Sequence, residues 1–404
     1  MKDREVGVGL VSVGWMGILH SRSYANFPKF YPELGIKPKL IIAADTTLER
    51  QEYAKDVLGY AQATSDYMDV INHPDVQVVS VCSPNYLHRE IGIAVARAGK
   101  ALWIEKPVGR SGVETAELEA EVVKAGIVTS IGFNYRCTPA IQYAREIIAA
   151  GDLGEITHFR GSFFADYSAE ANSALSWRFK KEFAGSGVLG DLMGHLVDLI
   201  HYTVGPISEA NGFTKTVYKD RPILPMGSAT HFAVIEGGER GAVENEDYAG
   251  ALVKIGESGI GAGAIGTIEA SRISVGPRSA YNIEIYGTKG SLKWDFERMN
   301  ELELSLGRNG ANVGYQRIMA NSYFGDFSKF QPGSGTSMGY DDLKVIELKR
   351  FMQAYFGEAS ENSNIHDATS AGRVCDAIEQ SQASGSWTKV PATKGTTAAL
   401  KAKK

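Results

Sequence analysis

The first third of the chain alternates apolar strand-like runs with helix-like segments, and this alternation constrains the fold more than any other feature. Strands are expected at 6–13, 40–45, 76–82, 101–104 and 128–133, with helices between them at 14–26, 47–58, 87–98 and 113–125. Runs such as VQVVSVC (76–82) are apolar throughout, as in parallel strands that are buried on both faces. The pattern therefore predicts an α/β domain with a doubly wound parallel sheet covered by helices.

The pattern changes after residue 133, where strands follow one another with few helices between them. Helices are expected at 139–150 and 188–204, and strands at 156–164, 210–217, 248–255, 262–271, 281–286, 291–295 and 302–306. Such a series predicts a second, α+β domain built on a large, mostly antiparallel open sheet. Residues 308–339, rich in Gly, Ser and Asn, are expected to form a loop, and two helices are expected at 341–356 and 367–384.

Chain length, charge and cysteine content argue against several classes of protein. A chain of 404 residues exceeds one typical domain, and its net charge of −5 argues against nucleic acid as the main partner. No apolar run approaches the roughly 20 residues that span a bilayer, and the N-terminus lacks a signal-peptide pattern, so no membrane partner is expected. The 3 cysteines are widely separated, which fits a reducing cytoplasm and, with the scattered histidines, predicts no metal site.

The stretch LVSVGWMGILH (10–20) has the order strand, glycine turn, helix that is typical of a dinucleotide-binding loop. Ser12, Gly14 and Gly17 occupy the three positions of the Gly-x-Gly-x-x-Gly pattern. The first position eases the turn, the second lets the backbone approach the pyrophosphate, and the third lets the helix pack on the strand. Serine therefore affects only the first task. Asp45, at the end of the second strand, is suited to bind both ribose hydroxyls and to repel a 2′-phosphate, which favours NAD over NADP.

These features together predict the domain boundaries. Residues 1–133 are expected to form a Rossmann dinucleotide-binding domain. Residues 134–385 are expected to form a substrate-binding and oligomerisation domain, whose last helices pack back on the first domain. Residues 386–404 are expected to be a flexible tail.

The expected helix at 188–204 carries a candidate acid–base pair. An apolar stripe occupies one face of this helix, while Asp191 and His195 lie one turn apart on another. A carboxylate at this distance can orient an imidazole and stabilise its protonated form, as a general base requires. Because the spacing Asp-x-x-x-His is common by chance, the spacing alone leaves a purely structural histidine open.

Several further motifs occur in order along the chain, many at expected strand ends. They are SPNYLH (83–88), GKALWIEKPVG (99–109), GFNYRCTPAI (132–141), GDLGEI (151–156), SWRF (176–179), AGSGVLGDLMGHLVDL (184–199), NEDYA (245–249) and GTKGSL (287–292). With the glycine loop, residues 5–385 resemble the Gfo/Idh/MocA family of NAD(P)-dependent sugar and polyol oxidoreductases, whose hallmark is the triplet Glu105-Lys106-Pro107. The stretch 168–187 is most similar to the branch that contains levoglucosan dehydrogenase, whereas Ser12 departs from the family pattern.

The resemblance implies a set of site residues. Lys106, Asp191 and His195 would be catalytic, with His195 as a general base aided by Asp191, and with Lys106 on the reacting oxygen. The cofactor would be NAD, held by Ser12, Gly14, Trp15, Met16, Gly17, Asp45, Ser83, Pro84, Asn85, His88, Glu105, Lys106 and Asn134. The substrate would contact Lys106, Tyr135, Arg136, Tyr167, Trp177, Arg178, Asp191 and His195, with His201 as a further candidate. The second sheet would mediate a homodimer or homotetramer.

Three functions remain open at this point. The first is an NAD-dependent dehydrogenase that acts on a carbohydrate hydroxyl of a pyranose, an anhydro sugar, a glycoside C3 position or a cyclitol. The second is an NAD-dependent glycoside hydrolase that works through a transient 3-keto intermediate, with elimination and water addition. Arg178, Lys180 and Lys181 would then suit an anionic sugar such as a sulfoquinovoside. The third is a non-catalytic NAD-binding sensor.

Overall fold

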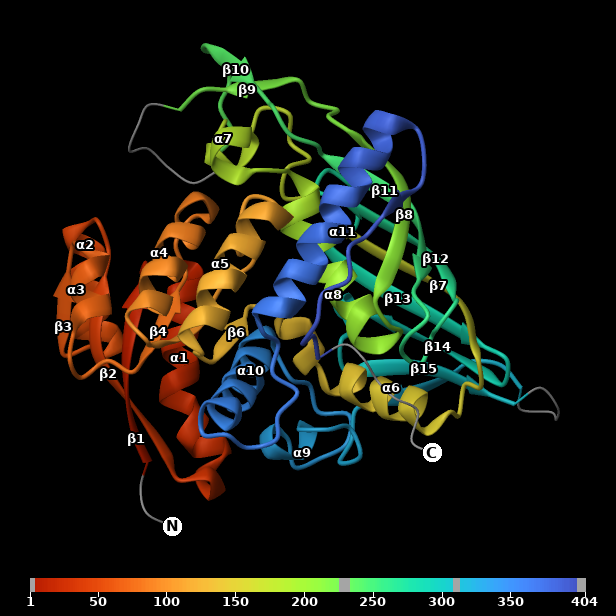
Figure 1. Cartoon of the computed structure of the whole chain (residues 1–404), viewed down its shortest axis with the longest axis horizontal. Helices are drawn as coiled ribbons and strands as arrows, with labels where there is room; N and C mark the ends of the chain where they lie inside the picture. The colour runs from red at the N-terminus through yellow and green to blue at the C-terminus, as the bar shows by residue number, and fades with distance from the viewer. Residues whose placement is uncertain (1–3, 225–232, 308–312, 398–404) are drawn as a thin grey trace.

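The computed structural model describes residues 4–224, 233–307 and 313–397, which form two large sheets flanked by helices. Figure 1 shows the N-terminal α/β layer on the left of the molecule, the larger sheet on the right, and the C-terminal helices between the two. The arrangement agrees with the predicted combination of a parallel α/β part and a second part built on a different sheet.

The first sheet contains six parallel strands in the order β3-β2-β1-β4-β5-β6. Its strands are β1 (Arg4–Val11), β2 (Ile36–Ala44), β3 (Gln62–Thr64), β4 (Val78–Val81), β5 (Ala101–Ile104) and β6 (Thr129–Ile131). Its helices are α1 (Trp15–Phe30), α2 (Leu48–Tyr53), α3 (Tyr67–Asn72), α4 (Asn85–Arg97) and α5 (Gly112–Ala125). Strand order reverses between β1 and β4, and ligands of such sheets bind in the crevice at this switch point.

Two elements of this part were absent from the prediction. Strand β3 has only three residues and α3 has six, and both are too short to give a clear periodic pattern. Helix α1 also runs four residues further than expected, to Phe30, with Pro28 inside it. The strands β1, β4 and β5, which precede loops of the candidate site, were predicted in type and place, and β4 and β5 are buried throughout.

The second sheet has nine strands in the order β16-β15-β14-β13-β7-β12-β11-β8-β17. Its strands are β7 (Ile156–Ala165), β8 (Ile207–Lys215), β11 (Tyr248–Ile255), β12 (Ile265–Ser271), β13 (Ser279–Gly287), β14 (Gly290–Asp295), β15 (Glu301–Leu306), β16 (Gln316–Met319) and β17 (Thr388–Lys389). All pairings are antiparallel except that of β7 with β12. This confirms the predicted open, mostly antiparallel sheet. Strands β9 (Asp220–Pro222) and β10 (Arg240–Ala242) pair in a separate two-stranded antiparallel sheet.

The long helix predicted at 188–204 is divided into two types of helix. Residues Leu189–Met193 form a π-helical segment, and α8 (Gly194–Thr203) continues it as an α-helix. Leu196 of α8 packs on Gly161 of β7, where a Cβ atom would lie 2.6 Å from the leucine side chain. The stretch Lys181–Thr203 is long and apolar enough for a membrane span, but 67% of the tested window is buried in the fold. It therefore behaves as a core helix.

The remaining helices pack on both sheets. Helix α6 (Pro139–Ala150) contacts β14 and β15, α10 (Tyr340–Tyr355) contacts α1, and α11 (Ile365–Ser384) contacts both α5 and β8. The region 308–339 differs from the predicted loop, because β16 extends the second sheet and α9 (Phe327–Phe330) follows it. Within that region, residues 308–312 lie outside the described part of the chain.

The tail expected at 386–404 is tied to the fold as far as residue 397. Strand β17 pairs with β8, and Arg373 donates hydrogen bonds to the Ala392 carbonyl and the Thr393 hydroxyl. Thr397 N–H donates to Asp367, with an N–O distance of 3.0 Å. The described part of the tail, 386–397, is therefore bonded to the fold, which its polar composition does not reveal because the partners lie far away in the sequence. Residues 398–404 lie outside the described residues.

Candidate active site

The loop between β1 and α1 has the geometry of a pyrophosphate cradle. Ser12 adopts a φ of 76°, in the left-handed region that favours glycine, and no other described non-glycine residue has a positive φ. A Cβ atom on Gly17 would collide with the Ser12 carbonyl oxygen, so this glycine allows close packing of helix and strand. A Cβ atom on Gly14 would meet only the Ser12 hydroxyl, at 3.8 Å, so the space beside Gly14 is open to a ligand.

The start of helix α1 beside this loop is available to an anion. Gly14 is the N-cap and provides no side-chain hydrogen bond, and the first turn holds no acidic residue. Backbone N–H groups at such a helix end bind phosphate groups. Asp45 Oδ2 accepts from Val13 N–H at 2.9 Å and Oδ1 from Thr47 N–H at 3.2 Å, which fixes the carboxylate beside the loop. These residues fit a dinucleotide, with the pyrophosphate on α1 and a ribose at Asp45.

The other residues predicted for the cofactor fall into two groups. Six of them lie at the carboxyl end of the sheet: Trp15 and Met16 begin α1, Ser83 and Pro84 lie in the loop after β4, Asn85 begins α4, and Asn134 follows β6. His88 and Glu105 are different, because each is buried and already bonded to other protein groups. Both ring nitrogens of His88 face backbone carbonyls, so its prediction as a direct cofactor ligand is not supported by this geometry.

Lys106, in the loop after β5, meets Asp191 from the π-helical segment. The lysine Nζ donates to Asp191 Oδ1 at 2.9 Å and to the Asp191 carbonyl oxygen at 2.8 Å. The Tyr167 hydroxyl donates to Asp191 Oδ2 at 2.5 Å. Burial alone would raise the pKa of Asp191, but the positive charges of Lys106 and then Arg178 hold this pKa well below its usual range. The carboxylate is therefore charged and has fixed partners on both oxygens.

His195 lies beside this cluster in an aromatic pocket. Its ring is 4.8 Å from the Tyr135 ring and 5.8 Å from the Phe133 ring, both edge-on. Burial, followed by the charge of Lys106, lowers the pKa of His195 well below its usual value. The imidazole is neutral at physiological pH, so it can accept a proton.

The predicted Asp191–His195 pair is not formed as expected. Both Asp191 oxygens are bonded to Lys106 and Tyr167, and the described residues show no hydrogen bond from Asp191 to His195. The spacing of four residues puts side chains in register on an α-helix, but a π-helical segment closes its hydrogen bonds over five residues. Glu246 holds this segment, because its carboxylate accepts from Gly187 N–H at 2.7 Å and Leu189 N–H at 2.9 Å. The sequence had not indicated this role for Glu246.

A small pocket opens next to Asp191. Its walls include Asn85, Tyr167, Trp177, Arg178, Asp191 and Arg272. Three residues predicted to bind substrate, Tyr167, Trp177 and Arg178, thus share one cavity with Asp191. The Arg178 guanidinium stacks on the Trp177 ring at 4.6 Å, and the described residues place no carboxylate within ion-pair distance of it. Arg272, by contrast, is bonded to Asp247 at 2.9 Å.

Four predicted residues lie elsewhere. Arg136 is 1% exposed, and its guanidinium binds Asp198 and Asp367, so it belongs to a buried ionic network instead of the substrate pocket. His201 is buried against Ser370 of α11, 3.3 Å from its hydroxyl. Lys180 and Lys181 form surface ion pairs with Glu244 at 2.8 Å and Glu379 at 2.9 Å. Of the expected basic trio, only Arg178 faces the pocket.

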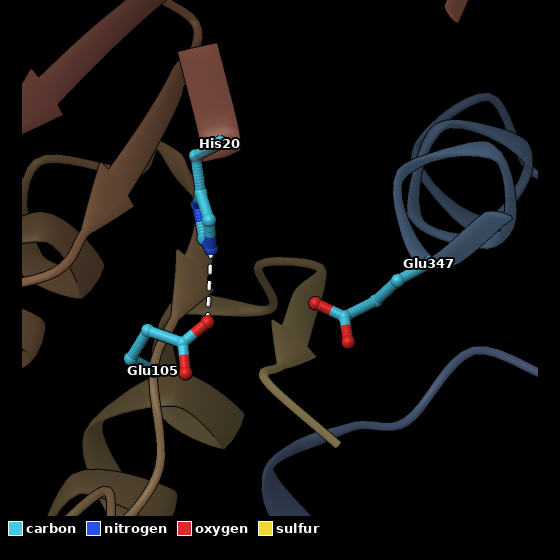
Figure 2. A group of neighbouring side chains, drawn as sticks. All are labelled: His20, Glu105 and Glu347. Atoms are coloured by element: carbon cyan, nitrogen blue, oxygen red, sulfur yellow. Dashed lines mark hydrogen bonds and ion pairs between the residues drawn. The ribbon is translucent and has the colours of Figure 1, made fainter. Parts of the chain in front are cut away.

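A buried charged cluster lies directly behind the Lys106 loop. Figure 2 shows His20, Glu105 and Glu347 converging from three separate parts of the chain, with the His20 ring directed at the Glu105 carboxylate. The His20 Nε2–Glu105 Oε1 distance is 2.9 Å. The three groups are close enough to hold a metal ion, but Lys344 Nζ lies 2.5 Å from Glu105 and 3.0 Å from Glu347. A lysine ammonium therefore already supplies the cation between the two carboxylates.

Comparisons with known proteins agree with this geometry. The family model described as "Oxidoreductase family, NAD-binding Rossmann fold" matches residues 6–133, and the model of the GFO/IDH/MocA C-terminal domain matches residues 141–293. The chain is 35% identical to levoglucosan dehydrogenase of Pseudarthrobacter phenanthrenivorans, over 96% of this chain and 99% of that protein. It is 23% identical to scyllo-inositol 2-dehydrogenase (NAD(+)) of Bacillus subtilis, over 72% of this chain and 74% of that protein.

Solved structures give the same result. Levoglucosan dehydrogenase in complex with NADH matches with a TM-score of 0.89 and 34% identity, and the match covers 96% of this chain and 100% of that chain. The complex of levoglucosan dehydrogenase with NADH and levoglucosan matches with a TM-score of 0.89 and 33% identity, over the same shares of both chains. The cradle at Gly14 and Asp45, the two matched domains and these relatives lead to one conclusion: the chain belongs to the GFO/IDH/MocA family of NAD-binding oxidoreductases.

Proposed function

We propose that this protein transfers hydride between a hydroxyl-bearing carbon of a small carbohydrate and NAD. The observation that carries the proposal is the cluster of Lys106, Asp191 and Tyr167 beside the neutral His195, at the edge of a pocket. The relatives support the substrate class, because they include levoglucosan dehydrogenase, its complexes with levoglucosan and L-sorbose, and an inositol dehydrogenase. Pyranoses, anhydro sugars and cyclitols are therefore the substrates to test.

Each member of the cluster has a separate task in this proposal. NAD supplies the hydride acceptor when it is bound. His195 takes the hydroxyl proton, since its imidazole is neutral. The Lys106 ammonium hydrogen-bonds the same oxygen and stabilises the negative charge that develops on it. Asp191 acts by holding Lys106 through a 2.9 Å ion pair, and Tyr167 holds the second carboxylate oxygen.

The pocket also favours a narrower substrate class. Arg178 is partly buried and faces the pocket, and no described carboxylate lies within ion-pair distance of it. A guanidinium in that position is suited to bind a carboxylate or sulfonate with two hydrogen bonds. We therefore include uronic and sulfonated sugars, and their glycosides, among the candidate substrates.

Self-association through the second sheet is a further part of the proposal. By strand register, Phe213, Leu252 and Ile265 lie on one face of β8, β11 and β12, and they are 56%, 53% and 59% exposed. An apolar patch of this kind marks an interaction surface. The Leu252→Asp variant should shift the protein toward monomers in light scattering coupled to gel filtration. A cytoplasmic location, compatible with three free cysteines, stays a prediction.

The proposal is tested by incubating the protein with NAD and a panel of sugars, cyclitols, sugar acids and glycosides. NADH that accumulates in step with ketone formation supports a dehydrogenase. Glycoside cleavage without net NADH would instead identify a redox-neutral hydrolase. Tight NAD binding without turnover on any compound would point to a sensor. In the first case, Lys106→Met and His195→Gln should each lower kcat strongly while both variants still bind NAD.

A further inference from the structure

The motif NEDYA (245–249) takes no part in the proposed chemistry, yet Glu246 within it holds the start of the π-helical segment. Its Oε1 atom accepts from Gly187 N–H at 2.7 Å and from Leu189 N–H at 2.9 Å. Its main-chain carbonyl oxygen accepts from Val188 N–H at 3.0 Å. A Cβ atom on Gly187 would collide with that carbonyl oxygen, so glycine permits this close approach. Three successive N–H groups are thus bonded to one buried residue.

The residues on either side of Glu246 fix it in place. The amide nitrogen of the buried Asn245 donates to the Arg178 carbonyl oxygen at 2.8 Å. The amide oxygen of Asn245 accepts from Arg272 at 2.9 Å, and the same guanidinium is bonded to Asp247 at 2.9 Å. Glu246 therefore stands on a rigid base between two anchored neighbours, so its carboxylate can hold the helix segment in one position.

The register of this segment decides which partner Asp191 can reach. On a regular α-helix, residues four apart lie on the same face, so Asp191 would lie beside His195. The π-helical segment closes its hydrogen bonds over five residues, as from Gly194 N–H to the Leu189 carbonyl oxygen. In this register the Asp191 carboxylate meets Lys106 at 2.9 Å instead. Short π-helical turns inside helices are rare and frequently occur at functional sites.

We propose that Glu246 is a positioning residue for Asp191. By binding the N–H groups at the start of the segment, it maintains the π-helical register and so directs the Asp191 carboxylate to Lys106 instead of His195. This inference rests on the proposed function, which needs the Lys106 ammonium on the reacting oxygen and a proton-accepting His195. Without Glu246, the segment is free to take the α-helical register, and the carboxylate would move from the ammonium to the imidazole.

The consequence for His195 follows from the groups around it. The titratable and charged groups that face this residue are Glu105, Lys106, Tyr135, Asp191, Tyr281 and Lys344. Burial, followed by the charge of Lys106, lowers the pKa of His195. A carboxylate in direct contact favours a protonated imidazole and raises its pKa. A shift of Asp191 to His195 would therefore let the imidazole take up a proton at a higher pH and stop it from acting as a base.

Two variants of Glu246 separate the acceptor from the size of the side chain. Glu246→Gln keeps an oxygen in the place of Oε1, so both N–H groups stay bonded. Glu246→Leu has a similar size but no acceptor, so the N–H groups of Gly187 and Leu189 lose their partner. The readout is the titration of His195 in the cofactor-free protein, followed by NMR of isotope-labelled histidine and assigned with His195→Gln. This readout does not depend on turnover.

The expected result is a change in Glu246→Leu alone. Its His195 should titrate at a pH about 1–3 higher than in the parent, whereas Glu246→Gln should match the parent. Adding Asp191→Asn to Glu246→Leu should return the titration toward that of the parent, because the displaced carboxylate is removed. On the best sugar, Glu246→Leu should lose kcat by about 100-fold, the effect of a misplaced reacting group, with the Kd for NAD unchanged.

If Glu246→Leu does not fold, Glu246→Asp replaces it, because the shorter side chain cannot reach both N–H groups, and the same change is expected. An unchanged His195 titration in the folded variant, or an equal change in Glu246→Gln, would overturn the inference. So would a change that persists after Asp191→Asn is added. Loss of the folded state in every Glu246 variant would instead make this residue a determinant of stability and end the proposal.

Lys106→Met, measured on the same sugar panel, distinguishes the two possible failures. If Lys106→Met turns over normally, the proposed function fails, whatever the histidine titration shows. If Lys106→Met is inactive while His195 titrates alike in the parent and in the Glu246 variants, only the role of Glu246 fails.

Discussion

Replacing Ser12 by glycine should stabilise the protein, although serine is the natural residue at this position. Ser12 has a φ of 76°. A non-glycine residue in this conformation costs about 1–2 kcal/mol. Glycine removes that cost but adds about 0.5–1 kcal/mol of backbone entropy in the unfolded chain. The difference predicts a gain of about 0.5–1 kcal/mol in the free energy of unfolding for Ser12→Gly.

The backbone contact of Ser12 is preserved in this variant, because Ser12 N–H donates to the Ala44 carbonyl at 2.8 Å and does not involve the side chain. Urea unfolding of the cofactor-free protein, followed by tryptophan fluorescence, measures the change. The midpoint should rise without a change in slope. We expect the Kd for NAD to be unchanged or tighter, because we assign the binding of the pyrophosphate to backbone N–H groups of the loop and not to the Ser12 hydroxyl.

Two results would refute this reasoning. If Ser12→Gly unfolds at a lower urea concentration, the positive φ is not a source of strain. If its Kd for NAD is weaker by about fivefold or more, the Ser12 hydroxyl contacts the cofactor. Ser12→Ala keeps the backbone strain and removes only the hydroxyl, so it separates the two explanations.

Four further predictions follow from particular contacts. Gly17→Ala should lower the melting temperature, because the added Cβ would collide with the Ser12 carbonyl oxygen. Gly14→Ala should fold normally but bind NAD more weakly, which melting curves and calorimetry on both variants will measure. Asp45→Asn should lower the preference for NAD over NADP, measured as the ratio of kcat/KM values, and an unchanged ratio would contradict the assigned ribose contact. Burial raises the pKa of the Glu347 carboxyl to about 7. The protonated side chain therefore stabilises the fold fully at low pH, and this stabilisation is lost as the pH rises through 7. In melting curves recorded from pH 5 to 8, Glu347→Gln should remove this loss. Ending the chain after residue 394 should lower the melting temperature, because Thr397 bonds to the buried Asp367 carboxylate, and an unchanged melting temperature would contradict a stabilising role of that contact.

The fold was predictable where structure depends on local pattern. The buried strand β4 and the glycine loop each carry a short signal, and β11 was placed at its observed bounds, Tyr248–Ile255. Short elements such as β3 carry too few residues for a period to appear. The tail is tied to α11 by a hydrogen bond between Thr397 and Asp367, which are 30 residues apart in the sequence. A local sequence pattern cannot predict such a contact.

The structure brings together several residues of the predicted site, but not in the predicted pairings. The spacing of Asp191 and His195 predicted a mutual contact, yet the carboxylate is held by Lys106, 85 residues away in the sequence. Arg136 directly follows Asn134 and Tyr135 in the sequence, but its side chain lies in a buried ionic network with Asp198, 62 residues away. The partners of an ion pair are set by which charged groups lie close together in the folded chain, so their spacing in the sequence does not predict the pair.

The central claim is that Lys106 acts in the transfer of hydride from a carbohydrate hydroxyl to NAD. The most direct measurement compares kcat of the parent and of Lys106→Met on the best substrate from the panel, with NAD affinity and melting temperature measured on the same samples. The account predicts a fall in kcat of about 10²–10⁴-fold, the range for loss of one positioned proton or charge donor, with the Kd for NAD nearly unchanged. The melting temperature should fall, because the Asp191 carboxylate loses the ammonium that pairs with it. A Lys106→Met variant that turns over at the rate of the parent would contradict it.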